Sequence, residues 1–351
     1  MKIAFTGGKT GGHIYPALSF IKGLESKHEI FYIGNKDSFE EEIMKKNNVR
    51  FYGIEVVGIE RKLTFKNVKN CMILFNAVKK AKQILKEEKP DYVIGVGGFV
   101  SYPALKAAKD LKIKIILHEQ NQVPGLVNKI FSKSAMCTLT SFPKTYKHIK
   151  GKCLYSGNPR TYEFYTNSIN KHRFNHKMLV VFGSMGSSSL INFFIKNCHL
   201  LENKGFDVYI VLGKNFKEKM TINEEYHNIH FLEYIDNMKE FLLDIDLVVS
   251  RSGATTLSEI IGYRIPAILI PSPYVTNDHQ TKNAIVLKNL GSALVYEEKI
   301  LNSEIFNDII RLMKFGNEYF KMCQSYEKYE YVNSIQVLEN FLGDKDGEAN
   351  I

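Results

Sequence analysis

The sequence predicts an α/β fold built from two doubly wound domains, each a parallel sheet covered by helices. Three observations predict it. Apolar runs of strand length alternate with helical patterns along the whole chain, as they do in βαβ units. At 351 residues the chain is longer than one hydrophobic core usually supports. A pattern of strand, Gly-rich turn and helix at the N-terminus occurs again near residue 178.

The predicted strands include, in chain order, KIAFTG, DYVIGV, IKIILH, MLVVFG, DVYIVLG, DLVVS and PAILIP. The clearest internal echo pairs DYVIGVGG (91–98) with DLVVSRSG (246–253). Each begins with Asp, continues with β-branched residues and ends in a loop of small residues. A second echo pairs IAFTGGKTGGHIYPALSFIKGL with LVVFGSMGSSSLINFFIKN. Two similar domains therefore fit the chain better than one large sheet.

The remaining segments complete the predicted order. The stretch 65–90 reads as an amphipathic helix that ends at Pro90. Residues 156–177 are polar and lack periodicity, which is the composition of a linker. From about residue 316 the chain reads as one or two Tyr-rich helices, followed by a frayed tail. The predicted domains are therefore residues 1–158 and 159–324.

Composition indicates a globular protein, with 44% apolar and 24% charged residues. No apolar run has the roughly eighteen residues that a membrane-spanning helix needs, and the N-terminus reads as a strand rather than a signal peptide. We therefore expect a cytoplasmic location. The five cysteines form no CxxC pair and are expected to be reduced packing residues.

The net charge of +10 is unevenly divided. Residues 1–158 contain 27 Lys and Arg against 13 Asp and Glu, a net charge of +14, whereas the remainder has 20 against 24, a net charge of −4. This asymmetry suggests that the first domain faces an anionic surface, either nucleic acid or anionic lipid. The alternative is a drift in Lys usage with no partner.

Three loops that follow predicted strands are rich in small residues: 7–12, 183–187 and 250–254. Glycine lets backbone amides approach an anion closely, and the next helix N-terminus favours negative charge. The loops therefore predict a diphosphate ligand. None matches GxxxxGK[ST] or GxGxxG, which disfavours ATP hydrolysis and ordinary NAD binding. The alternative is that each Gly only satisfies a tight turn.

Two histidine-containing motifs follow strands of the first domain. His13 lies where the first helix starts, a position that favours a neutral imidazole able to accept a proton. His13 is therefore a candidate general base, or else a residue that only caps the turn. In LHEQNQVPG, Glu119 and Asn121 belong to a polar cluster that is costly to bury without a ligand. A structural hydrogen-bond network is the alternative.

In the second domain, RSGATTLSEI offers hydroxyl donors at a helix start and Glu259 farther along the helix. A carboxylate there suits the hydroxyls of a ribose, and the alternative is a surface glutamate. Gln280 adds an amide that can hydrogen-bond hydroxyls. The pair Asp244 and Asp246 is not expected to bind metal, because Asp246 begins a strand and faces away from the ligand edge. No metal cluster is predicted.

The helix 65–90 carries an apolar stripe with lysines beside it, and the stripe consists of Val68, Met72, Phe75 and Val78. Such a surface suits anionic lipid, where each Lys near the surface contributes about 1 kcal/mol. The alternative is that the stripe packs entirely on its own sheet.

Taken together, seven motifs resemble the MurG family, the N-acetylglucosaminyltransferases of peptidoglycan synthesis. They occur in the family's order and approximate spacing, between Lys2 and about Leu290, and read GGKTGGHIYPAL, GVGGFVSYPAL, HEQNQVPG, GNPR, GSMGS, RSGATTLSEI..GYRIPAILIP and DHQTKNA. The resemblance implies a GT-B fold, two Rossmann-like domains facing a cleft, with a C-terminal helix at about 325–345 packing back on the first domain.

The resemblance also implies an activity: inverting transfer of N-acetylglucosamine from UDP-N-acetylglucosamine to the 4-hydroxyl of the muramoyl sugar of lipid I, which forms lipid II. It implies a peripheral enzyme on the cytoplasmic face of the cell membrane, with no obligatory cofactor, a role in cell shape and division, and other cell-wall and division enzymes as partners. His13 and Glu119 are the implied acid/base residues, and the membrane patch falls on Val68, Met72, Phe75 and Val78. The implied substrate-binding residues are Thr10, Gly11, Gly12, Asn121, Arg160, Ser184, Ile235, Ala254, Thr255, Thr256, Leu257, Ser258, Glu259 and Gln280.

The chain departs from the family pattern in three loops. Lys9 replaces a third glycine and is strained if the site needs a positive φ. GNPR lacks the residue that usually separates Pro from Arg160. Phe182 and Ser187 replace a glycine and an alanine, which is expected to alter how a diphosphate is seated.

Four other functions are less consistent with the sequence. A UDP-N-acetylglucosamine 2-epimerase or a glycolipid synthase shares the architecture. An epimerase does not need an apolar and basic face, so the lysine-flanked stripe at 65–90 disfavours it. A non-catalytic sugar-nucleotide-binding scaffold is disfavoured because His13, Glu119, Glu259 and Gln280 are all present. A nucleic-acid-binding protein is least favoured, because no recognised module occurs.

Overall fold

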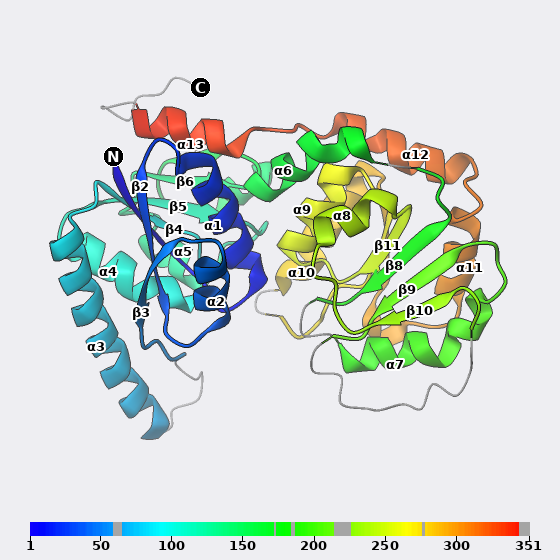
Figure 1. The fold of residues 1–351 in the computed structure, drawn as a ribbon, viewed down its shortest axis with the longest axis horizontal. Helices are drawn as coiled ribbons and strands as arrows, with labels where there is room; N and C mark the ends of the chain where they lie inside the picture. The colour runs from blue at the N-terminus through cyan, green and yellow to red at the C-terminus, as the bar shows by residue number, and fades with distance from the viewer. Residues whose placement is uncertain (59–64, 172, 184–186, 214–225, 276–277, 344–351) are drawn as a thin grey trace. The chain divides into compact units, whose positions relative to one another are not determined.

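The computed structural model describes residues 1–351 except 59–64, 172, 184–186, 214–225, 276–277 and 344–351. The chain divides into two compact units (Figure 1). Unit 1 comprises Met1–Arg160 together with Val332–Ile351, and unit 2 comprises Thr161–Tyr331. Over the described part of the chain, none of the helices combines the length and the apolar content that crossing a membrane requires.

Unit 1 is built on a seven-stranded sheet in the order β3-β2-β1-β4-β5-β6-β7, with every neighbouring pair parallel. Its strands are β1 (Lys2–Thr6), β2 (Glu29–Asn35), β3 (Arg50–Ile54), β4 (Tyr92–Gly95), β5 (Lys114–Glu119), β6 (Cys137–Thr140) and β7 (Cys153–Tyr155). Its helices are α1 (Gly11–Leu24), α2 (Phe39–Lys46), α3 (Phe65–Glu88), α4 (Tyr102–Asp110), α5 (Leu126–Phe131) and α13 (Ser334–Gly343).

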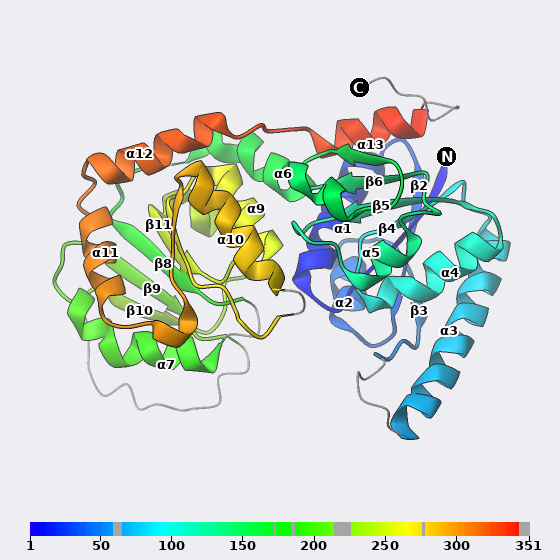
Figure 2. The ribbon, with the colours of Figure 1, turned by 180° about the vertical axis from the view of Figure 1, so that it is seen from behind.

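Helices cover both faces of this sheet (Figure 2). Buried residues of α3, α4 and α5 form one core with residues of β1, β2, β4 and β5. Residues of α1, α2 and α13 form the other core. The C-terminal helix α13 packs closely on α1 at Gly23. A Cβ at this position would lie only 2.5 Å from the side chain of Ile335, so the close approach requires glycine. The last described helix thus belongs to the core of the first unit.

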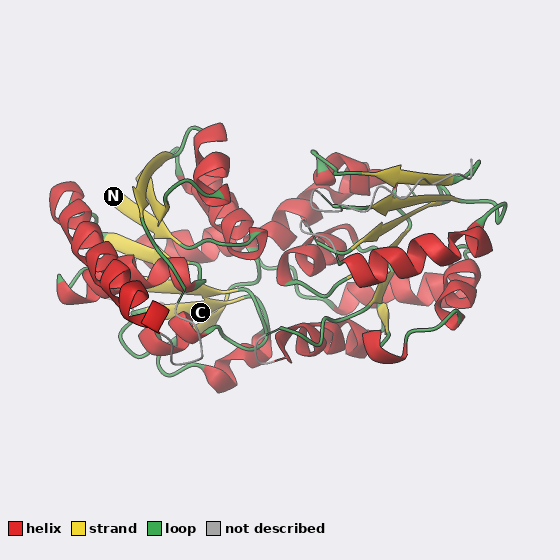
Figure 3. Ribbon diagram, turned by 90° about the horizontal axis from the view of Figure 1, so that it is seen from below, coloured by secondary structure: helices red, strands yellow, loops and turns green. Residues whose placement is uncertain are grey.

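Unit 2 has a six-stranded parallel sheet in the order β10-β9-β8-β11-β12-β13. Figure 3 shows strands in yellow and the helices around them in red. Its strands are β8 (Lys177–Val181), β9 (Asp207–Val211), β10 (Ile229–Leu232), β11 (Leu247–Ser250), β12 (Ala267–Leu269) and β13 (Ala293–Val295). Its helices are α7 (Ser188–Asn197), α8 (Met238–Phe241), α9 (Ala254–Tyr263), α10 (His279–Leu290), α11 (Glu304–Leu312) and α12 (Asn317–Ser325), while α6 (Pro159–Asn167) spans the boundary between the units.

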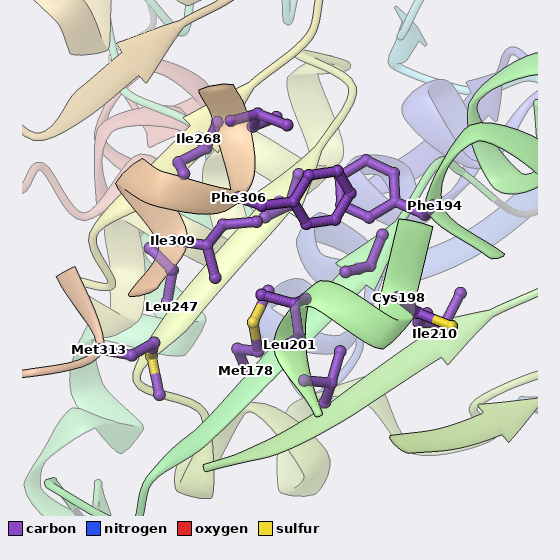
Figure 4. Packing of buried hydrophobic residues seen from close by; sticks show 14 of the residues in the cluster. Met178, Phe194, Cys198, Leu201, Ile210, Leu247, Ile268, Phe306, Ile309 and Met313 are labelled. Carbon is purple, nitrogen blue, oxygen red and sulfur yellow. The ribbon is translucent and has the colours of Figure 1, made fainter. Parts of the chain in front are cut away.

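The core on one face of this second sheet is rich in aromatic and sulfur-containing side chains (Figure 4). Phe194 of α7 and Phe306 of α11 lie with their ring centroids 5.4 Å apart above strand residues such as Ile268 and Leu247. Helices α9 and α10 bury the opposite face. Because both faces are covered, the strands read as continuous apolar runs, which is why they could be predicted.

All seven predicted strand segments are strands, and the internal echoes correspond to equivalent places in the two sheets. β1 pairs with β4 as β8 pairs with β11. Asp91, before β4, accepts a hydrogen bond from the amide of Lys2 at 2.7 Å, and the buried Asp246 accepts one from the amide of Phe174 at 2.8 Å. Asp246 therefore binds backbone amides at the amino end of its strand, away from the ligand edge, as the sequence predicted. In each sheet the strand order reverses at this central pair, and ligands of such sheets bind at its carboxyl end.

The prediction of a linker at 156–177 is wrong for its first part, which forms α6 and a short 3₁₀ segment, Ser168–Asn170. Phe164 of α6 is fully buried and packs edge-on against Tyr263 with ring centroids 4.9 Å apart. Gly262 permits this approach, because a Cβ there would lie 2.4 Å from that of Phe164. Tertiary contacts of this kind bury one side of a segment that is polar and non-periodic in sequence.

Candidate active site

The first Gly-rich loop follows β1 and contains a strained lysine. Lys9 has φ 77°, a left-handed conformation that costs a non-glycine residue free energy. The loop is held by Glu40, whose carboxylate is 1% exposed and accepts hydrogen bonds from the amides of Lys9 and Asn35, each at 3.3 Å. The predicted condition for strain at Lys9, a positive φ, is therefore confirmed.

His13 lies in the first turn of α1, directly after Thr10, Gly11 and Gly12. Its Nδ1 is 3.2 Å from the hydroxyl oxygen of Thr10. A Cβ at Gly97, which follows β4, would lie 3.2 Å from Nε2 of His13 and 3.6 Å from the side-chain nitrogen of Asn128. The absence of a Cβ at Gly97 thus leaves room for both the imidazole and this amide beside the carboxyl end of β4.

Glu119, at the end of β5, is 2% exposed, and both of its oxygens are occupied. Oε1 accepts hydrogen bonds from the amide and the side-chain nitrogen of Asn121, at 2.9 and 3.2 Å. Oε2 accepts from the amide of Gly125 at 3.0 Å and from Asn128 at 2.8 Å. Burial raises the pKa of Glu119, although these donors oppose the shift. Four donated bonds make this carboxylate well suited to hold the loop 121–128 in place.

The neighbouring His118 and Gln120 are also buried. Burial lowers the pKa of His118 to about 4, so its ring is neutral near pH 7. Gln120 donates from Nε2 to the carbonyl of Val96 and to Nδ1 of His118, both at 2.9 Å. These two side chains fit the alternative of a structural hydrogen-bond network, while Asn121 stays partly exposed.

Arg160 is placed in the first unit, where its guanidinium lies 5.0 Å above the ring of Tyr15 on α1. Asn128 also belongs to this site, although it was not among the predicted site residues. Its side chain is 1% exposed and bonds to both Glu119 and the carbonyl of His118. It lies three residues beyond the LHEQNQVPG motif, in α5, and no predicted element or motif singled it out.

The second unit contains a pocket of about 310 Å³ at the carboxyl edge of its sheet. That volume is within the usual range for small-molecule sites. Its lining residues are Phe182, Ser187, Ser189, Arg251, Ser272, Tyr274, Val275, Gln280 and Glu298. Of the predicted site residues Gln280 lines it, and its Oε1 accepts a hydrogen bond from the amide of Ser272 at 2.8 Å.

Helix α9 carries most of the other predicted donor-binding residues. Ala254 begins it, and the buried hydroxyl oxygen of Thr255 has no hydrogen-bond partner among the described residues. Leu257 is fully buried in the core, and Ser258 donates to the carbonyl of Ala254 at 2.7 Å. Those two side chains are engaged within the protein. Of the other predicted positions, Thr256 is partly exposed, whereas Glu259 and Ile235 are buried, at 7% and 9% exposed. Ser184 lies outside the described residues.

The two charged residues of the pocket, Arg251 and Glu298, were not among the predicted site residues. Arg251 was visible as the first residue after the strand DLVVS. Glu298 lies in a 3₁₀ turn, Glu298–Ile300, and had no motif around it. The structure pairs them at 2.8 Å.

The predicted membrane stripe on α3 is largely exposed. Val68, Met72 and Phe75 are 63%, 65% and 71% exposed, whereas Val78 is only partly exposed. The helix buries a different side, including Ala81 and Leu85. A purely internal role for the first three side chains does not fit this packing.

Comparison with known proteins places the chain in a family. Models of the glycosyltransferase family 28 N-terminal and C-terminal domains match residues 3–140 and 178–335. The UDP-N-acetylglucosamine--N-acetylmuramyl-(pentapeptide) pyrophosphoryl-undecaprenol N-acetylglucosamine transferase of Bacillus subtilis is 38% identical over 320 residues, which cover 87% of this chain and 88% of that protein.

Solved structures share the fold. MurG of Acinetobacter baumannii matches with a TM-score of 0.74 at 22% identity, over 97% of this chain and 99% of that one. A putative UDP-N-acetylglucosamine 2-epimerase of Listeria monocytogenes matches with a TM-score of 0.70 at 13% identity, over 97% and 95%. The architecture alone therefore does not separate transferase from epimerase, whereas the sequence similarity does. The chain belongs to glycosyltransferase family 28 and, within it, to the MurG family of N-acetylglucosamine transferases.

Proposed function

We propose that this chain transfers N-acetylglucosamine from UDP-N-acetylglucosamine to the 4-hydroxyl of the muramoyl sugar of lipid I, forming lipid II in peptidoglycan synthesis. The observation that carries the proposal is the similarity to the Bacillus subtilis transferase along nearly the whole chain. Its name specifies both the donor nucleotide sugar and the undecaprenol-linked muramyl acceptor. The two glycosyltransferase domains support the same reaction class.

The donor would bind unit 2. The start of α9 and the Arg251 side chain offer the positive charge that a diphosphate requires. Gln280 and Glu259 would hold hydroxyls of the sugar and the ribose. Stabilising charge on the departing UDP by such fixed groups lowers the barrier to cleavage of its bond to the anomeric carbon. We further propose that no metal is obligatory; Asp246 is already engaged by backbone amides, and Asp244 pairs with Lys177 at 3.4 Å.

The acceptor hydroxyl would be activated in unit 1. Its oxygen attacks the anomeric carbon from the side opposite to UDP, so the configuration inverts, and His13 takes the proton. We assign Nδ1, 3.2 Å from the Thr10 hydroxyl oxygen, as the ring nitrogen that carries the hydrogen, and Nε2 as the nitrogen that accepts the proton. Since the oxygens of Glu119 are fully occupied by donors, we assign Glu119 a positioning role through Asn128 rather than proton transfer.

We also propose that the protein works as a peripheral enzyme at the cytoplasmic face of the cell membrane, where the lipid acceptor is held. The exposed stripe on α3 and the excess of Lys and Arg in residues 1–158 support contact with anionic lipid. We expect cell-wall and division enzymes that work on the same acceptor as partners. We do not expect the protein to bind nucleic acid.

The test is UDP release by the purified protein with UDP-N-acetylglucosamine and a short-chain lipid I analogue, with and without acceptor and with and without a chelator. We expect acceptor-dependent UDP, a disaccharide product and no loss of rate with the chelator. His13→Ala should lower kcat by at least about a hundredfold, the usual contribution of a general base, with little change in donor affinity. Acceptor-independent epimerisation would favour the epimerase, and binding without turnover would favour a scaffold. An unchanged kcat would remove His13 from the mechanism.

A further inference from the structure

The donor pocket of unit 2 contains a carboxylate where an anionic ligand is expected. Arg251 Nη1 lies 2.8 Å from Oε2 of Glu298, and the two side chains are only 11% and 12% exposed. Both line the same pocket. A carboxylate in this position is unexpected, because it would repel the phosphates of a nucleotide sugar.

The ion pair is embedded in a set of further hydrogen bonds. Arg251 donates from Nη1 to the carbonyl of Ile270 at 3.1 Å and from Nη2 to the hydroxyl of Ser187 at 3.0 Å. Ser189 donates to Oε1 of Glu298 at 2.9 Å. Burial alone would raise the pKa of Glu298, but the positive charge of Arg251 and the hydrogen bond from Ser189 outweigh it, so the pKa lies below its usual value. Glu298 is therefore ionised at neutral pH.

The two partners differ in how firmly they are placed. Arg251 follows the central strand β11 and is fixed by the Ile270 carbonyl as well as by Ser187. Glu298 begins a three-residue 3₁₀ turn whose neighbours Glu297, Lys299 and Ile300 are exposed. Rotation of the Glu298 side chain away from Arg251 would expose its carboxylate to water, whereas the guanidinium would keep its bonds to the Ile270 carbonyl and Ser187. A diphosphate can then form the charge-assisted bonds that the carboxylate gives up.

We propose that Glu298 is an internal anion that occupies Arg251 in the empty donor site and competes with the donor diphosphate for it. Glu298 thereby limits donor affinity and speeds the release of UDP after transfer. This inference rests on the proposed function only in placing a nucleoside diphosphate in this pocket.

The experiment measures binding of UDP and of uridine, which lacks phosphate, to the full chain and to Glu298→Gln by calorimetry, with UDP dissociation followed by stopped flow. We expect Glu298→Gln to bind UDP about tenfold more tightly, equal to about 1.4 kcal/mol, mainly through slower dissociation. Uridine binding should not change. Glu297→Gln is the matched control, because it removes the same charge from an exposed neighbour and should leave both ligands unaffected.

Glu298→Asp, which keeps the charge but withdraws it by one methylene, should fall between the wild type and Glu298→Gln. Unchanged or weaker UDP binding by both variants would overturn the proposal, because Glu298 would then be inert or would position Arg251 for the ligand. Equal tightening by Glu297→Gln would also overturn it, since the effect would be long-range charge. If the wild type binds no UDP, the donor site of the proposed function fails instead.

Discussion

At the scale of single residues, Lys9 is one of several described non-glycine residues with a positive φ, and it lies in the first Gly-rich loop. Its φ of 77° is one that glycine adopts freely, yet the chain has a lysine whose ammonium lies 5.1 Å from the centre of the Phe99 ring. A left-handed conformation costs a residue with a Cβ about 1–2 kcal/mol. The hydrogen bond to the buried Glu40 holds the amide in this conformation.

We predict that Lys9→Gly raises the free energy of unfolding by about 0.5–1 kcal/mol, because relief of the strain exceeds the added entropy of glycine in the unfolded chain. Urea denaturation measures the change. Lys9→Ala keeps the Cβ and should show no such gain. A loss of stability in Lys9→Gly would mean that the contact with Phe99 outweighs the strain.

The polar side chains at 118–121, within the motif LHEQNQVPG, differ in their burial. The motif LHEQNQVPG predicts a single polar cluster that includes Glu119 and Asn121. The structure separates the four side chains: three are buried and bonded within the protein, and Asn121 alone stays partly exposed. Residue type shows that such groups need partners, but only the fold decides whether the partner is a ligand or another side chain.

At the scale of elements, α3 combines a buried side and an exposed apolar stripe. Ala77, Ala81 and Leu85 pack on the sheet, while Met72 and Phe75 point away from that core. Exposed lysines such as Lys69, Lys79 and Lys80 lie on the same helix. This arrangement fits a helix that lies against an anionic lipid surface.

We predict that the double variant Met72→Ser/Phe75→Ser weakens binding to vesicles containing anionic lipid by more than about tenfold, since each large apolar side chain contributes about 1.5–3 kcal/mol when buried. Vesicle sedimentation measures it. Turnover of a soluble short-chain acceptor should be spared. The control Ile169→Ser/Ile300→Ser removes two exposed apolar side chains from unit 2, where Ile169 is 89% and Ile300 73% exposed, and should not alter vesicle binding. Unaltered binding in the α3 variant would exclude the stripe as a lipid contact.

At the scale of the whole molecule, each unit has its own sheet and its own two cores. The chain passes between the units within α6 and again after Tyr331. Each unit thus has the hydrophobic interior that independent unfolding requires.

We predict two unfolding transitions in calorimetry. UDP should raise the midpoint temperature of only the transition that belongs to unit 2. A ligand at 100 times its Kd stabilises the state that binds it by about 2.7 kcal/mol. Scanning calorimetry with increasing UDP measures this, and Glu298→Gln should increase the shift at equal UDP. A single transition that moves as a whole would show that the units unfold together.

The sequence by itself determined the parallel strands, the two-domain plan, the Gly-rich loops and the family. Strands buried on both faces are continuous apolar runs, and loops that need positive φ or close approach require glycine, so both features are local and readable. The tertiary structure decided what depends on distant partners: the helix α6 built on Phe164 and Tyr263, the bond of Asn128 to Glu119, and the pairing of Arg251 with Glu298. The last two residues are 47 positions apart in the sequence and meet because β11 and β13 end at the same edge of one sheet. Pairing across such an edge leaves no periodic trace in the chain, because it is set by strand order and not by spacing.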